Sequence, residues 1–330
     1  MKELRSLFVP VLAVISVLIL CFAGTGAHAD DIFAYWLSQI KQKAIQEGIS
    51  SQTVNKALEG LEPVERVIAL DRKQPEKTIT FAEYKNRILS KTRIEKGREM
   101  MRRHARILNA VSDAYNVQPQ YIVALWGIET NYGGFTGGFH VIPALATLAY
   151  DGRRGEFFTA ELLTALKIVD EGHIKIENMK GSWAGAMGQN QFMPSSFKKF
   201  SVDYNQDGRR DIWHTYDDIF ASSANYLAQS GWNGDERWGR KIRLPVGFDI
   251  TLVGKDIKKS LHEWRRLGLM TVNGNPIPVV EGMEAYIVMP DGPEGDVYLA
   301  YNNFDTLLKW NRSTYFATSV GLLADLIAGG

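Results

Sequence analysis

The sequence has 330 residues and a single cysteine. That residue, Cys21, lies within an apolar run near the N-terminus, so a chain processed beyond it has neither a disulfide nor a thiolate nucleophile. Internal repeats and low-complexity segments are also absent. A secreted chain without disulfides must rely on its hydrophobic core, and about 300 residues are enough to form a large one.

The first 29 residues follow the order of a secretory signal peptide. Charged residues in MKELR precede an apolar run at 7–23, and Ala27-His28-Ala29 then precedes two aspartates. We predict cleavage after Ala29 and export to the periplasm. The alternative is a retained anchor, because the run approaches the roughly 17–25 residues that span a bilayer. Pro10 and the small residues at the end favour cleavage.

The sequence also has no excess of positive or negative charge. Removing residues 1–29 leaves 36 of the 38 basic and 36 of the 37 acidic residues, so the mature chain would carry no net charge. This balance argues against nucleic acid as a partner, since nucleic-acid-binding domains are usually strongly basic.

Apolar residues recur at helical spacing through most of the chain. Helices are predicted near residues 32–47, 51–61, 81–104, 105–115, 119–132, 157–170, 195–200, 219–229 and 304–327. Residues 71–80, which include Pro75, are predicted to form a loop. After Trp238 the pattern becomes strand-like at residues 242–244, 248–252, 285–289 and 297–301, with a short helix at 257–267. The predicted fold class is therefore mainly α (α+β), with a small mixed α/β insertion.

The eight residues GIETNYGG, at 127–134, place Glu129 where an apolar helix meets a glycine-rich break. The helix is entered through Pro119, a residue suited to the first turn. Beside Leu125, Trp126 and Ile128, the carboxyl is expected to be partly desolvated. Desolvation raises the pKa of a carboxyl, so Glu129 is a candidate general acid. The alternative is a structural Glu that caps the helix or forms a local ion pair.

The segment DYNQDGRRDIW carries oxygen-bearing side chains at alternate positions. Asp203, Asn205 and Asp207, followed by Gly208, match the first half of an EF-hand loop, in which the glycine permits a sharp turn. Arg209 would contribute its backbone carbonyl. These residues predict a structural Ca²⁺ site.

The second half of this loop departs from the EF-hand pattern. His214 stands at the twelfth position, where a bidentate Glu is usual. Asp217 is predicted to close a longer loop instead, and Asp211 and Asp218 are weaker candidates. The alternative is a surface turn without metal, because Asp, Asn and Gly are common in turns.

Several motifs, taken in order, resemble the membrane-bound lytic murein transglycosylase B family. The similarity extends over nearly the whole predicted mature chain. The motifs are GIS at 48–50, DRKQPE at 71–76, GIETNYGG at 127–134, DGRRGEFF at 151–158, GSWAGAMGQNQFMPSSF at 181–197, ANYLAQSGW at 224–232 and WNRSTYF at 310–316.

The resemblance implies a lysozyme-like catalytic core, flanked by an N-terminal helical domain and a small β-containing insertion, that acts on peptidoglycan glycan strands. It divides the chain into residues 30–104, 105–240, 241–303 and 304–330, the last being a helix that returns to the core. The implied reaction cleaves the β-1,4 bond between N-acetylmuramic acid and N-acetylglucosamine without water. Glu129 would act as acid and then as base, leaving a 1,6-anhydromuramic acid end. No organic cofactor is implied.

Matching residues to the family motifs assigns sugar-binding roles to Ser182, Gln191 and Tyr226. The first two would hydrogen-bond sugar or N-acetyl groups, and Tyr226 would orient the carboxylate or the acetamido group. Tyr84 matches a tyrosine that lines the cleft. Without the motifs, ordinary loop hydrogen bonding or core packing would explain all four residues.

Further matches extend the implied substrate site. Arg153 and Arg154 would meet peptide or lactyl carboxylates, a role suited to planar cations, although a solvated pair is the alternative. Met187 would form an apolar wall. Near the end of the chain the resemblance assigns substrate contacts to Trp310, Asn311 and Phe316. Trp310 and Phe316 stand where the family often has tyrosine, so they keep the aromatic rings but lose the hydroxyls.

Two other functions remain open at this point. A hydrolytic muramidase would need a second working carboxylate, for which Asp151, Glu156 and Glu161 are candidates. A non-catalytic peptidoglycan-binding protein would not need Glu129 at all. The expected partner is the glycan strand, with other cell-wall enzymes as further candidates, and the chain is expected to be a monomer.

Overall fold

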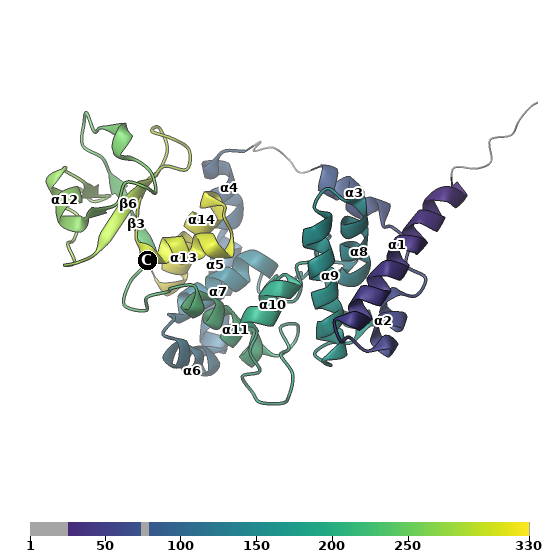
Figure 1. Cartoon of the computed structure of the whole chain (residues 1–330). Helices are drawn as coiled ribbons and strands as arrows, with labels where there is room; N and C mark the ends of the chain where they lie inside the picture. Colours follow the sequence, from purple (N-terminus) through teal and green to yellow (C-terminus); the bar gives the residue numbers. More distant parts are fainter. Residues whose placement is uncertain (1–25, 74–78, 330) are drawn as a thin grey trace, which may run out of the picture.

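The computed structural model describes residues 26–73 and 79–329 (Figure 1). Most of the predicted signal peptide therefore lies outside the described residues. Within these two ranges the chain is mainly helical, with a five-stranded and a two-stranded sheet. None of the helices described there combines the length and the apolar character needed to span a membrane.

The first of three apolar clusters, the N-terminal cluster, combines helices from two separate parts of the sequence. Helices α8 and α9 pack on each other, and α2 and α3 pack against them. Figure 1 shows this group on the side of the purple N-terminal helix. Its helices are α1 (Gly26–Gln46), α2 (Ser51–Leu58), α3 (Glu65–Arg72), α8 (Val141–Asp151), α9 (Gly155–Asp170) and α10 (Pro194–Phe200).

The second, the central cluster, surrounds α7. This helix is apolar on every face, and residues 121–127 are all buried, mainly against α14 and α5. A helix that is hydrophobic all round is stable only when other elements cover it. The cluster contains α4 (Phe81–Ile88), α5 (Lys91–Arg103), α6 (Ala105–Tyr115), α7 (Pro119–Thr130), α11 (Tyr216–Gln229), α13 (Asn302–Trp310) and α14 (Thr314–Ala328).

The third, the sheet cluster, is a small antiparallel sheet with the strand order β4-β6-β7-β3-β5. The predicted hairpin forms between β6 and β7, with Tyr286 opposite Ala300. Its elements are β3 (Gly239–Arg243), the 3₁₀ turn η2 (Ile250–Leu252), β4 (Lys259–Ser260), α12 (Leu261–Arg266), β5 (Met270–Thr271), β6 (Glu284–Val288) and β7 (Val297–Ala300). Elsewhere, β1 (Phe139–His140) pairs with β2 (Lys180–Gly181), and η1 (Ile176–Asn178) precedes β2.

Some element predictions were wrong. Residues 248–252 form no strand, because Asp249 accepts hydrogen bonds from Thr251 and folds the chain into η2. The predicted C-terminal helix breaks between Trp310 and Thr314, where Asn311 is extended. Helices α3 and α8 were missed. Residue 104, the predicted boundary of the N-terminal domain, falls between α5 and α6, which contribute Met100 and Leu108 to the same central cluster.

Candidate active site

Helix α7 ends in a sharp left-handed turn directly after the last helical turn, which contains Glu129. Asn131, Tyr132 and Gly133 have φ values of 53°, 60° and 74°, a conformation that costs energy for residues other than glycine. Packing supports it: a Cβ at Gly127 would lie 2.6 Å from the Tyr132 ring. This close approach explains the first glycine of GIETNYGG and fixes the position of the helix end.

The Glu129 carboxyl is partly exposed and meets one donor from the far end of the chain. The indole Nε1 of Trp310 donates to Glu129 Oε1 over 2.8 Å. Burial raises the pKa of Glu129 to about 7, and the Trp310 hydrogen bond opposes that rise. A carboxyl with this pKa is protonated in a substantial fraction of molecules near neutral pH and can both give and take a proton.

Trp310 packs against both the central and the N-terminal clusters, so Glu129 lies where they meet. The Tyr226 ring lies 4.6 Å from the Trp310 ring, centroid to centroid, and Phe192 lies 5.3 Å away. The hydroxyl of Tyr226 donates to the backbone oxygen of Lys309 over 2.7 Å. The structure therefore places Tyr226 against Trp310 and the residue before it.

The loop that contains GAMGQNQF is fixed to α7 by a buried glutamine. The Gln189 side chain accepts a hydrogen bond from Trp126 Nε1 at 2.7 Å and donates one to the Trp213 backbone at 2.8 Å. Its backbone oxygen accepts from Thr130 Oγ1. Sequence reasoning did not single out Gln189. A buried amide that satisfies partners on two elements in this way defines how the loop sits beside Glu129.

Ser182 and Gln191 belong to the same loop, and both are partly exposed. Ser182 Oγ accepts from the Ala186 backbone N–H at 3.0 Å. The Gln191 amide donates to the backbone oxygens of Thr136 and Gly188. These bonds leave the Ser182 hydroxyl proton and the Gln191 carbonyl oxygen available to a ligand.

Tyr84, on α4, faces the same site. Burial, followed by the negative charge of Glu129, raises the pKa of its hydroxyl. Because the charge of Glu129 affects the pKa of Tyr84, the two side chains lie near each other. The Tyr84 ring also lies 5.8 Å from that of Tyr315, on α14.

Of three other predicted substrate contacts, two are buried and one is exposed. Met187 is fully buried and Phe316 is only 5% exposed, so neither presents a surface to a glycan in this conformation. Met187 packs in the N-terminal cluster and Phe316 in the central cluster. Asn311 is exposed, and its side chain accepts from the Ser313 backbone N–H in the break between α13 and α14.

Arg153 and Arg154 converge on Asp71, which is 2% exposed. Nε of Arg153 lies 2.9 Å and an Nη of Arg154 lies 2.8 Å from its carboxylate oxygens. The two guanidinium side chains remain 52% and 42% exposed. The pair thus satisfies a buried carboxylate and still offers N–H donors to solvent.

Asp203, Asn205 and Asp207 form a tight loop that binds its own backbone. The Asp203 carboxylate accepts from the N–H groups of Asp207 and Gly208 at 3.0 and 2.8 Å, and Asp207 accepts from that of Arg209 at 2.9 Å. Gly208 has φ +88°, as the predicted turn requires. The oxygen-rich side chains are held in one small loop, which fits a hard cation.

Two neighbouring aspartates, Asp217 and Asp218, follow this loop in the first turn of α11. Asp217 lines a different hollow, with Arg103 and Arg106 of α5 and α6. Asp218 is fully buried and accepts from the Tyr204 and Asp211 backbone N–H groups, each at 2.8 Å. In residues 26–73 and 79–329, no three His, Cys, Asp or Glu side chains form a metal-binding group. A cation here would therefore also need Asn205 and backbone carbonyls.

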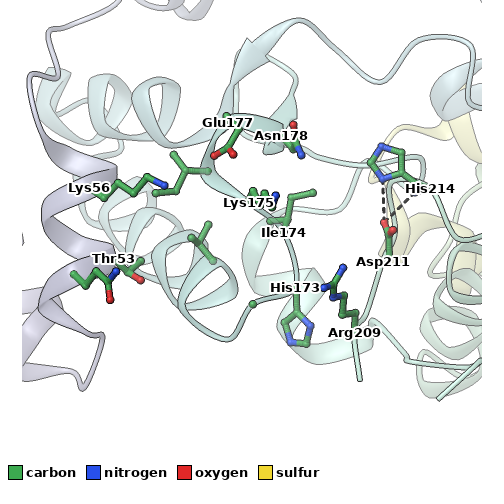
Figure 2. A pocket seen from close by; sticks show the side chains of 14 residues that line it. Thr53, Lys56, His173, Ile174, Lys175, Glu177, Asn178, Arg209, Asp211 and His214 are labelled. Carbon is green, nitrogen blue, oxygen red and sulfur yellow. Dashed lines mark hydrogen bonds and ion pairs between the residues drawn. The ribbon is translucent and has the colours of Figure 1, made fainter. Parts of the chain in front are cut away.

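A hollow of about 600 Å³ lies between α2, the segment before β2 and the end of the 203–214 loop (Figure 2). Arg209 and His173 are among the residues that line it, and His214 Nδ1 lies 3.5 Å from Asp211 Oδ1. Glu129 is not among the residues that line it. This hollow is therefore separate from the candidate active site.

The three carboxylates considered for a hydrolytic mechanism are placed as follows. Glu161 is buried and accepts from the backbone N–H and hydroxyl of Ser195 at 2.8 and 2.6 Å, at the start of α10. Asp151 pairs with Arg72 at 2.9 Å. Glu156 is exposed in the first turn of α9. The first two are committed to structural contacts.

Comparison with known proteins agrees with this arrangement. Residues 32–325 match the model of the Transglycosylase SLT domain family. The chain is 32% identical over 252 residues to membrane-bound lytic murein transglycosylase B of Escherichia coli K12, an alignment that covers 74% of this chain and 66% of that protein.

Two solved structures show how far the fold is shared. SltB3 from Pseudomonas aeruginosa, in complex with NAG-anhNAM-pentapeptide, has a TM-score of 0.87 and 44% identity over 90% of this chain and 80% of that chain. The Escherichia coli lytic transglycosylase Slt35, in complex with calcium, has a TM-score of 0.76 and 29% identity over 88% and 92%. These matches confirm the predicted fold class. The chain belongs to the Transglycosylase SLT domain family.

Proposed function

We propose that the protein is a lytic murein transglycosylase that cleaves the β-1,4 bond between N-acetylmuramic acid and N-acetylglucosamine in peptidoglycan. The observation that carries the proposal is the Glu129 carboxyl, whose pKa is about 7 and whose Oε1 is held by Trp310. Relatives support the substrate class, because one SltB3 structure contains NAG-NAM-pentapeptide and another its anhydro counterpart.

In the proposed reaction Glu129 first donates its proton to the glycosidic oxygen, and the bond from that oxygen to C1 of the muramoyl residue breaks. The C6 hydroxyl of the same sugar then attacks C1 and gives its proton to the Glu129 carboxylate. The products are a free 4-hydroxyl on the leaving sugar and a 1,6-anhydro ring. No water is consumed, and Glu129 returns to its starting state.

A single carboxyl suffices for these reaction steps, whereas a hydrolase needs a second one. The structural contacts of Glu161 and Asp151 favour the non-hydrolytic reaction. Ser182, Gln191 and Tyr84 are proposed to hydrogen-bond the sugars. The exposed faces of Arg153 and Arg154 are proposed to meet the peptide carboxylates.

The proposal extends to a structural Ca²⁺ and to the periplasm. Asp203, Asn205, Asp207 and the carbonyl of Arg209 are the proposed ligands, with Asp217 as the proposed closing residue, supported by the oxygen-rich loop and by the calcium complex of Slt35. Export rests on the signal sequence at residues 1–29.

The test is digestion of purified peptidoglycan sacculi, with products identified by mass spectrometry. We expect anhydromuramoyl ends from the wild-type protein and their loss in Glu129→Gln, which keeps the shape of the side chain but cannot donate the same proton. Glu156→Gln is the matched control and should retain activity. Reducing ends alone would indicate a hydrolase, and unchanged turnover by Glu129→Gln would exclude Glu129 from catalysis.

A further inference from the structure

Glu129 meets Trp310 through a group that can only donate. An indole N–H has no acceptor capacity, so the 2.8 Å bond from Nε1 uses a lone pair of Oε1 in both protonation states of the carboxyl. Oε2 has no hydrogen-bond partner in the described part of the chain. Because the carbonyl oxygen of a carboxylic acid is its better acceptor, Oε1 remains the carbonyl and Oε2 carries the proton.

We propose that Trp310 is a positioning residue that fixes Oε2 as the proton-carrying oxygen of Glu129. The inference rests on the proposed function for its catalytic consequence, but the hydrogen bond itself exists without substrate. Trp310 is 181 positions from Glu129, at the end of α13. The break between α13 and α14 follows directly after Trp310.

The indole is held on more than one side. Tyr226 of α11 and Phe192 of the loop that contains GAMGQNQF pack on the indole at ring-centroid distances of 4.6 and 5.3 Å. The bond from the Tyr226 hydroxyl to the Lys309 backbone oxygen fixes the residue just before it. A donor held by such packing is already oriented before the reaction begins, which is the condition for effective proton transfer.

The matched variants are Trp310→Phe and Trp310→Tyr, which both lose the indole and differ by one hydroxyl. The readout is the titration of the Glu129 carboxyl, followed by infrared difference spectroscopy against Glu129→Gln. Trp310 lowers the pKa of Glu129, so Trp310→Phe should titrate at a higher pH than wild type and Trp310→Tyr should lie between them. In turnover, Trp310→Phe should lose about tenfold or more in kcat with a smaller change in KM, and Trp310→Tyr should recover part of the loss.

An unchanged titration midpoint in Trp310→Phe, or identical midpoints in both variants, would overturn the proposal. If Trp310→Phe does not fold, Tyr226→Phe removes only the bond to Lys309 and should raise the midpoint by a smaller amount. A midpoint in Tyr226→Phe equal to that of wild type would also count against the proposal. If wild type were inactive on sacculi yet the midpoints shifted as expected, the proposed function would fail and the positioning role would stand.

A second inference concerns the sheet cluster and rests on Asp291, in the loop between β6 and β7. Its carboxylate accepts from the backbone N–H groups of Phe81 and Ala82, the first two residues of α4, the latter at 2.9 Å. The nearby Asp296 pairs with Lys85 of the same helix. A carboxylate at a helix N-terminus satisfies unpaired N–H groups and complements the helix dipole.

We infer that this loop positions α4, and with it Tyr84, beside Glu129. The sheet cluster would then support the glycan site from a distance of about 210 positions in sequence. Asp291→Ala should increase hydrogen exchange of residues 81–89 and raise KM for glycan strands more than it lowers kcat. Glu294→Gln, an exposed change in the same loop, should alter neither. Unchanged exchange in Asp291→Ala would refute the inference even if the enzyme is active as proposed.

Discussion

Glu129 and Asp218 are two carboxyls with pKa values raised chiefly by burial, yet their surroundings differ. Asp218 is fully buried, and each of its oxygens accepts a backbone N–H. Glu129 is partly exposed and has a single donor, the Trp310 indole, on one oxygen. The comparison teaches that burial alone does not make a carboxyl an acid catalyst. A free, accessible oxygen is also required, and Asp218 has none.

The largest expected effect is that of Glu129→Gln, which removes the unpaired carboxyl oxygen. Turnover of sacculi should fall by about a hundredfold or more, in line with the usual contribution of general acid–base groups. The folded structure of Glu129→Gln should be the same as that of wild type.

The same variant also tests stability. Because the folded-state pKa of Glu129 is raised from 4.5 to about 7, its contribution to stability is fully present below pH 4.5 and is lost as the pH rises to 7. Above pH 7 this loss amounts to up to about 3 kcal/mol. Glu129→Gln should therefore be more stable than wild type at pH 8, as measured by urea unfolding, and this advantage should disappear at pH 4.5. A variant that is inactive but no more stable at pH 8 would contradict the raised pKa.

Asp218→Ala, in contrast, should destabilise the protein. Two backbone N–H groups, those of Tyr204 and Asp211, would lose their acceptor, at a cost of about 1–3 kcal/mol each. Urea unfolding should show this loss. Asp217→Ala, one residue earlier and directed at another hollow, is the control and should change stability by no more than about 0.5 kcal/mol. If Asp217→Ala were the more damaging change, the structural role assigned to Asp218 would be wrong.

The smallest effect concerns the ion proposed near Asp218. Added Ca²⁺ at about a hundredfold excess over its Kd should stabilise the protein by about 2.7 kcal/mol. The melting temperature should therefore rise, and the rise should disappear in Asp203→Ala and decrease in Asp217→Ala. No change on adding Ca²⁺ or a chelator would mean that the loop is held by its internal hydrogen bonds alone.

Local signals were sufficient for much of the helical fold. Helix 105–115 was predicted at its observed bounds, and GIETNYGG placed Glu129 at a helix end, because capping and turn preferences act over a few residues. Helix α8 was missed because its residues 141–149 are buried on nearly every face and show no helical period. The choice between Asp217 and Asp218 depends on the rotation of α11, about 100° per residue, which its sequence does not define.

The site depends on contacts between distant parts of the chain. Nothing near Glu129 predicts that Trp310 would supply its donor, and the resemblance suggested only that a hydroxyl is missing there. Met187 and Phe316 match binding motifs, but their burial is set by neighbouring elements. Residue-by-residue matching thus proposes the site residues, and three-dimensional packing sets how exposed each of them is.

The central claim is that burial keeps the Glu129 carboxyl protonated up to neutral pH. Infrared difference titration of the wild-type protein against Glu129→Gln measures this carboxyl directly, without substrate. The account predicts a protonated band that disappears with a midpoint near pH 7. A midpoint near 4.5, the value of an ordinary Glu, would contradict it.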